Sequence, residues 1–90
     1  MYNDVDNTIK EEIKSECKKL NSEMLMVSKS SLNDKDGYLY LVLAKRLSKN
    51  FTEDESYIVW YYNSSLKGLN TGAYMLSFKD ALVEFSERLR

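Results

Sequence analysis

Few side chains in this sequence have the chemistry of a catalytic base, a nucleophile or a metal ligand. The chain has no histidine and one cysteine, Cys17. This excludes an imidazole general base, a Cys-His pair, an internal disulfide and a thiolate zinc site. Cys17 occupies an apolar position of an expected helix, where a buried and inert thiol is favoured over a reactive one.

The carboxylates offer the remaining route to chemistry. The run Glu53, Asp54 and Glu55 could supply paired acids, but consecutive acids in a connection are more often solvated, and no second acidic cluster accompanies them. Asp34 and Asp36 resemble the start of a calcium loop, which then fails because residues 38–43 supply no oxygen ligands. We therefore expect no enzyme, no cofactor and no metal. The run 53–55 is instead a charged tip that could engage a basic partner.

Length and charge limit the remaining classes. Ninety residues predict one domain over 1–90, with residues 1–7 expected to be flexible. Thirteen Lys and Arg residues against fourteen Asp and Glu residues give a net charge of −1, which makes nucleic acid an unfavoured partner. No apolar run approaches the ~20 residues of a membrane span. Together with the single cysteine, this predicts a cytoplasmic protein without membrane contact.

Two helices are predicted from apolar residues at helical spacing. The first covers residues 8–27, with Thr8 as its N-cap, and its apolar positions are Ile9, Ile13, Cys17, Leu20, Met24 and Val27. Its other faces carry lysine and glutamate in equal number and are read as solvated. The second covers residues 78–89, with Ser77 as its N-cap and Phe85 on its apolar face. Residues 28–37 are read as a polar connection.

Three strands are predicted between the helices, at residues 38–46, 56–62 and 71–76, because these segments are rich in aromatic and β-branched residues. Short connections make them an antiparallel meander. The fold class is therefore α+β in the order α-β-β-β-α. Both helices are expected to pack on one face of the sheet, formed by Leu39, Leu41 and Leu43 together with Trp60.

Tyrosine is the one residue type in excess, with seven in the chain. If the leucines and Trp60 face the helices, strand alternation places a set of tyrosines on the opposite, uncovered face: Tyr38, Tyr40, Tyr57 and Tyr61. Such rings can merely stabilise the sheet through cross-strand pairs, or they can form an interface with a protein partner or with a second copy. The sequence favours the two readings equally. In the second, Glu53, Asp54 and Glu55 assist association by charge steering.

The order of elements resembles that of the double-stranded-RNA-binding domain. That family reads RNA with lysines at the start of its last helix and with a histidine between its second and third strands. Here the last helix begins Phe78-Lys79-Asp80-Ala81, and residues 63–71 contain no histidine. The topology matches and the RNA-binding residues do not. A nucleic-acid-binding module is therefore the alternative function.

A second resemblance covers residues 38–90 and rests on three features. They are Tyr57-Ile-Val-Trp60-Tyr-Tyr62-Asn63, then Gly72-Ala-Tyr74, then the closing amphipathic helix. Together they resemble small proteins of phages and integrated elements of Gram-positive bacteria, although a histidine common in that class is replaced here by Ala73. The resemblance implies a non-enzymatic protein that binds and modulates or inhibits a host protein, with anti-CRISPR-like anti-defence as one form.

Overall fold

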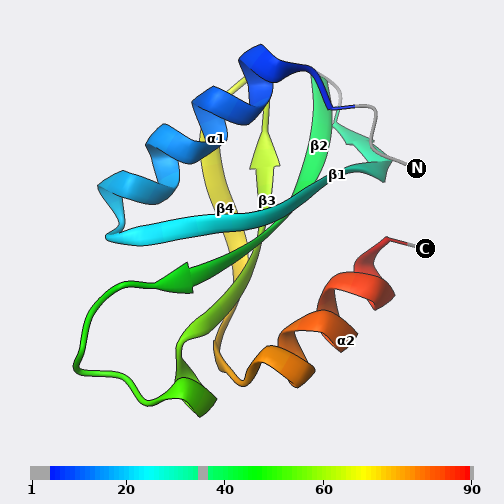
Figure 1. Cartoon of the computed structure of the whole chain (residues 1–90). Coiled ribbons are helices and arrows are strands. Elements are labelled where there is room, and N and C mark those ends of the chain that lie inside the picture. The colour runs from blue at the N-terminus through cyan, green and yellow to red at the C-terminus, as the bar shows by residue number, and fades with distance from the viewer. Residues whose placement is uncertain (1–4, 35–36, 90) are drawn as a thin grey trace.

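The computed structural model describes residues 5–34 and 37–89, without the side chains of 31–34, 37, 38 and 71. One helix stands at each end of the chain and four strands lie between them (Figure 1). The elements in chain order are α1 (Asn7–Lys19), β1 (Ser22–Asp34), β2 (Gly37–Arg46), the single-turn 3₁₀ helix η1 (Glu53–Glu55), β3 (Tyr57–Asn63), β4 (Gly68–Leu76) and α2 (Phe78–Arg88).

The four strands form one antiparallel sheet in the order β1-β2-β3-β4. This confirms the α+β class and the antiparallel meander. The strand number is a correction, because the sheet has a fourth strand, β1. That strand occupies the end of the helix expected over 8–27 and most of the polar connection expected over 28–37.

The first helix ends early because of Asn21. The backbone N–H of Leu20 donates to the Cys17 carbonyl at 3.0 Å, and Asn21 takes the left-handed conformation with φ of 52°. Asparagine tolerates this conformation better than most residues and commonly stands just after a helix. The chain then reverses, and Ser22 begins β1 opposite Arg46.

The beginning of α1 also differs from expectation. Its N-cap is Asp6, whose side chain accepts a hydrogen bond from the Thr8 backbone N–H at 2.8 Å. Val5 is buried in the core. Residues 5–7, expected to be flexible, are therefore part of the fold, whereas residues 1–4 lie outside the described residues. In α2, Ser77 is the N-cap as expected, with the Asp80 N–H donating to its Oγ at 3.1 Å.

The two helices cover opposite faces of the sheet, with α1 above it and α2 below it in Figure 1. Under α1, Ile13 and Cys17 pack against a set of β2 and β3 side chains: Tyr40, Val42, Ala44, Ile58, Trp60 and Tyr62. Under α2, Ala81 and Phe85 pack against the alternate set: Leu41, Leu43, Tyr57 and Val59. The expectation that both helices share the leucine face is wrong.

The physical reason lies in the register of β2 and β3. Leu41 pairs with Tyr61 and Val42 pairs with Trp60. Directly paired residues point to the same face of a sheet. The leucines of β2 therefore share a face with Tyr57, Val59 and Tyr61, whereas Trp60 lies on the other face. Both faces are apolar, so each requires a helix to cover it.

Candidate binding surface

The tyrosines expected on one uncovered face are divided between the two cores. Tyr40 is 7% exposed beneath α1, and Tyr57 is 8% exposed beneath α2, with its ring centroid 5.2 Å from that of Phe78. Tyr61 is half-buried on the α2 face, where the Arg88 guanidinium lies 5.0 Å from its ring. The side chain of Tyr38 is not among those that the structure describes. The single tyrosine surface does not form, and a homodimer through it loses its basis.

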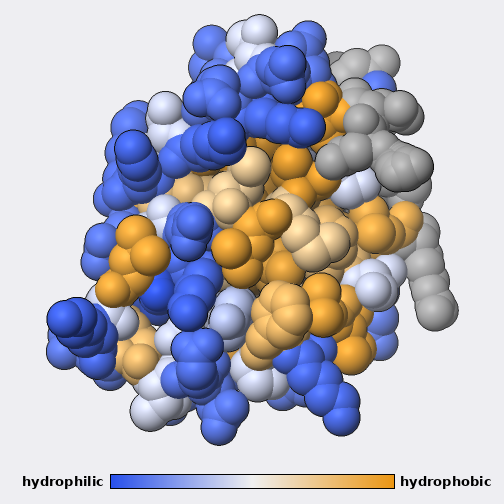
Figure 2. Space-filling model, viewed as in Figure 1, coloured by the Kyte–Doolittle hydropathy of each residue, from blue (hydrophilic) through white to orange (hydrophobic). Residues whose placement is uncertain are grey.

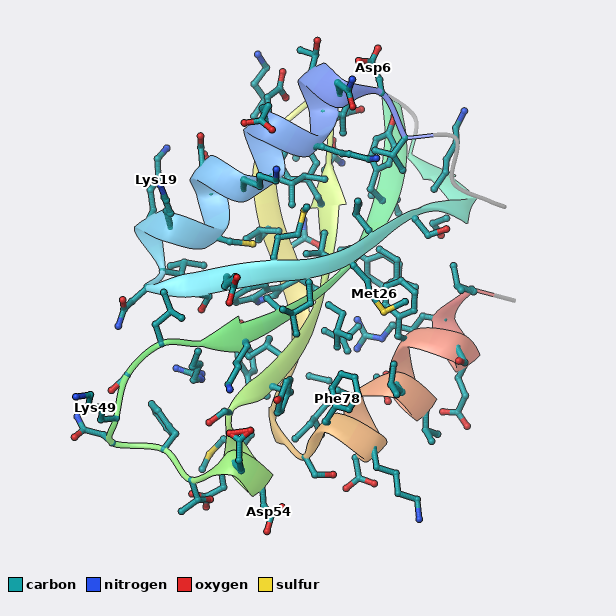
Figure 3. All side chains as sticks on the ribbon, viewed as in Figure 1. Asp6, Lys19, Met26, Lys49, Asp54 and Phe78 are labelled. Carbon is teal, nitrogen blue, oxygen red and sulfur yellow. The ribbon has the colours of Figure 1, made fainter. Side chains whose placement is uncertain are left out.

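The acidic run forms η1, where Glu55 accepts a hydrogen bond from the Thr52 hydroxyl at 3.1 Å. Glu53 forms an ion pair with the Lys45 ammonium at 3.3 Å and accepts a hydrogen bond from the Tyr57 hydroxyl at 3.2 Å. The hydrogen bond to Glu53 and its charge raise the pKa of Lys45. Asp54 is exposed and points away from the body of the molecule (Figure 3). Glu53 thus fastens the turn to β2 and β3, while Asp54 faces solvent.

The described residues form an open groove between α1 and β1, which sequence reasoning missed. It consists of two hollows of about 520 and 360 Å³. The larger is lined by Glu11, Lys14, Ser15, Lys18, Ser22, Glu23, Met24 and Leu47. The smaller is lined by Lys10, Lys14, Met24, Leu25, Met26 and Val27. Because the hollows share Lys14 and Met24, we treat them as one feature, the α1–β1 groove.

One wall of the groove carries a row of lysines. Lys10, Lys14 and Lys18 follow one another at intervals of four residues and so project from one side of α1. Lys14 forms an ion pair with Glu11 at 3.2 Å. Among the residues described, neither Lys10 nor Lys18 has an ion pair. The four-residue spacing is visible in the sequence, but the equal number of lysines and glutamates on this helix predicts a solvated face and no binding site.

The acidic residues of α1 lie mainly outside the groove walls. Glu12 accepts a hydrogen bond from the Tyr62 hydroxyl of β3 at 2.9 Å, and burial together with this bond raises the pKa of Tyr62. Glu16 forms an ion pair with Lys19 at 2.8 Å. The helix therefore presents lysines to the β1 edge and glutamates to the middle of the sheet. The groove itself is lined by three lysines and by Glu11 and Glu23, which leaves a net charge of +1.

The floor of the groove is apolar and partly exposed. Leu25 and Leu47 are 38% and 53% exposed, and Met24 packs against the core. A register shift between Met24 and Met26 marks a β-bulge at Leu25. Met26 is not part of this floor, because it pairs with Leu43 of the core beneath α2, and Figure 3 shows it on the α2 side of β1. Figure 2 shows apolar side chains gathered in the region between α1 and α2.

A cluster of aromatic rings around Arg46 lies on the α1 face, beside β4. The Arg46 guanidinium lies 4.5 Å from the Phe51 ring and 5.7 Å from the Tyr74 ring. The Tyr74 hydroxyl accepts a hydrogen bond from Trp60 Nε1 at 3.0 Å. Trp60 is only 2% exposed. This cluster covers the core instead of presenting an open site.

The described residues offer neither a metal-binding cluster nor a membrane-spanning helix. Over residues 5–34 and 37–89, no three Cys, Asp or Glu side chains are grouped so that they could hold a metal ion. No helix of the described chain is long and apolar enough to cross a membrane. Comparisons with protein-family models, curated proteins and solved structures found no match.

Proposed function

We propose that this chain is a small non-enzymatic binding protein that occupies another protein through the α1–β1 groove. The observation that carries the proposal is the groove itself, where exposed Leu25 and Leu47 lie beside the row of lysines. The resemblance to phage and mobile-element proteins adds the setting: the partner is a host protein, and inhibition of a host defence is one form of the function.

The energetics of such a contact support a protein partner. Burial of apolar surface contributes roughly 25 cal/mol per Å². Burial of Leu25 and Leu47 by a partner would therefore be favourable. Contiguous exposed apolar surface beside charged residues is typical of protein interaction sites. The acidic turn at η1 can add steering through Asp54, which faces solvent.

Nucleic acid remains the second candidate, because the lysine row could follow a phosphate backbone. Glu11 and Glu23 also line the groove, so its three lysines leave a net charge of only +1, whereas binding to a phosphate backbone relies on several uncompensated cations. Binding of unpaired bases usually relies on aromatic side chains beside the basic groups, and neither hollow is lined by an aromatic residue. The groove therefore favours a protein.

The proposal is tested by site-specific photo-cross-linking. Leu25 is replaced by benzoylphenylalanine in one variant, and the matched control carries it at Leu66, which is 73% exposed in the β3–β4 turn. Both are irradiated in a lysate of a Gram-positive bacterium. We expect a discrete protein adduct from position 25, absent from position 66 and removed by excess unmodified protein.

Two results would contradict the proposed function. Equal adducts from positions 25 and 66 would show that the groove has no special affinity for proteins. Metal-dependent nuclease or hydrolase activity that disappears in Glu53→Gln would show that the chain is an enzyme.

A further inference from the structure

We infer that the occupant of the α1–β1 groove is an acidic amphipathic helix of the partner protein. The inference rests on the proposed function and specifies the chemistry of the partner. It is argued from the charges on the groove wall, from the apolar floor and from the irregular backbone of β1.

The lysine row selects for negative charge, because its three lysines outnumber the two glutamates of the groove, Glu11 and Glu23. From Lys10 to Lys18 the row extends ~12 Å along the helix, with steps of ~6 Å between neighbouring lysines. Carboxylates four residues apart on a partner helix repeat at the same ~6 Å interval. Lys10 and Lys18 have no ion pair among the described side chains, so a partner carboxylate would not need to displace an existing one.

The floor selects for apolar side chains beside the acidic ones. Leu25 lies in the hollow that is also lined by Lys10 and Lys14, and Leu47 lies in the hollow that is lined by Lys18. A partner that fits both parts must carry acidic residues on one side and apolar residues on the neighbouring side. Met24, which lines both hollows, adds to this fit because the flexible side chain of methionine adapts to different apolar surfaces.

The backbone of β1 favours a helix over an added strand. β1 is an edge strand, but its register with β2 shifts between Met24 and Met26 and again between Lys29 and Asn33. An added strand needs a regular ladder of backbone hydrogen bonds, and bulges interrupt such a ladder. A helix satisfies its own backbone and needs only side-chain contacts from the groove.

Four synthetic peptides of about four helical turns test the inference. Three share one pattern of leucine and phenylalanine and carry glutamate, glutamine or lysine at every charged position. The fourth is the glutamate peptide with a central proline, which breaks the helix. Fluorescence anisotropy at low salt should rank glutamate above glutamine and glutamine above lysine. The proline peptide should bind at least tenfold more weakly than its parent, and added salt should weaken the glutamate peptide most.

Variants of the protein locate the binding. Lys10→Glu/Lys18→Glu should weaken the glutamate peptide by roughly tenfold and strengthen the lysine peptide. The control Lys67→Glu/Lys79→Glu has the same net charge but changes residues outside both hollows, so it should alter affinity little. Leu25→Ser should weaken every peptide, whereas Leu66→Ser should not. Circular dichroism establishes that each variant is folded.

Three outcomes would overturn the inference: a charge-independent ranking, equal binding of the proline peptide, or equal effects of the two double variants. Single-stranded DNA that binds as tightly as the glutamate peptide and ignores Leu25→Ser would also overturn it, in favour of nucleic acid. If cross-linking from position 25 succeeds while the peptides fail, the proposed function stands and only the acidic helix is wrong. If both the cross-linking and the peptide binding fail, both the proposed function and the acidic helix are wrong.

Discussion

At the scale of single residues, Cys17 gives the folding stability its clearest pH dependence. Its thiol is fully buried beneath α1, and burial, with a smaller contribution from Glu16, raises its pKa from 9.0 to about 11. Between these values the unfolded thiol ionises while the folded thiol keeps its proton. Cys17 therefore contributes stability that is present below pH 9.0 and is lost as the pH rises to about 11.

The comparison of wild type with Cys17→Ala isolates this contribution. The wild-type free energy of unfolding should fall more steeply with pH in that interval than that of the variant. Urea denaturation at a series of pH values measures both slopes. The alkaline effects of Tyr62 and Lys45, whose pKa values are also raised, are common to both proteins. Parallel curves would contradict the prediction.

Gly72 controls the position of Tyr74. A Cβ atom at Gly72 would lie 2.5 Å from the Tyr74 ring, whereas a Cβ at Gly68 would meet nothing within 4 Å. Because the Tyr74 side chain is half exposed, Gly72→Ala should turn the ring toward solvent and break its hydrogen bond with Trp60. Trp60 is the sole tryptophan of the chain, so its fluorescence spectrum reports the change.

The matched control for this experiment is Gly68→Ala, which should leave the emission of Trp60 unchanged. Tyr74→Phe removes the same hydrogen bond without a steric clash and should shift the emission in the same direction as Gly72→Ala. A Gly72→Ala spectrum identical to that of wild type would show that the ring does not depend on Gly72.

At the scale of elements, α2 is attached to the sheet mainly through Phe85. This side chain is 3% exposed and packs with Leu41, Leu43 and Val59. Phe85→Ala should lower the free energy of unfolding by ~3–5 kcal/mol, as truncation of a core phenylalanine does. Val83→Ala on the same helix should cost far less, since Val83 is 50% exposed. Urea denaturation of both variants tests this, and equal midpoints would refute the packing of α2.

At the scale of the whole molecule, the sheet leaves little regular surface for a second copy. One helix covers each face. Both edge strands are irregular, with register shifts in β1 and in β4, and bulges discourage edge-to-edge pairing. We therefore expect a monomer in light scattering across a range of protein concentrations. A dimer that persists on dilution would contradict this expectation and would reopen self-association as the use of the groove.

What the sequence determined by itself was local. The strands expected over 38–46 and 56–62 and the helix over 78–89 agree with β2, β3 and α2 to within one residue at each end. Alternation and helical spacing are properties of neighbouring residues, so they are readable without tertiary contacts. The shortage of groups able to act as catalysts was likewise evident from composition.

The identity of β1 depended on tertiary structure. Met24 and Val27 are three residues apart and face the same core, as they would in a helix. In β1 the bulge at Leu25 produces that spacing, because the extra residue offsets the alternation of the strand. Helical periodicity and a bulged strand were therefore indistinguishable there, although Asn21 offered a stop signal.

Tertiary structure alone also decided the faces of the sheet and, with them, the candidate site. Each strand shows which of its residues alternate, but only the pairing of β2 with β3 determines which two sets meet. A shift of one residue in this pairing would move every side chain of the strand to the opposite face of the sheet. That pairing buried Tyr40 and Tyr57 in different cores. The docking of α1 beside β1 then created the groove, from Leu47 and from lysines and apolar residues of the segment 8–27, for which the sequence predicts a single helix.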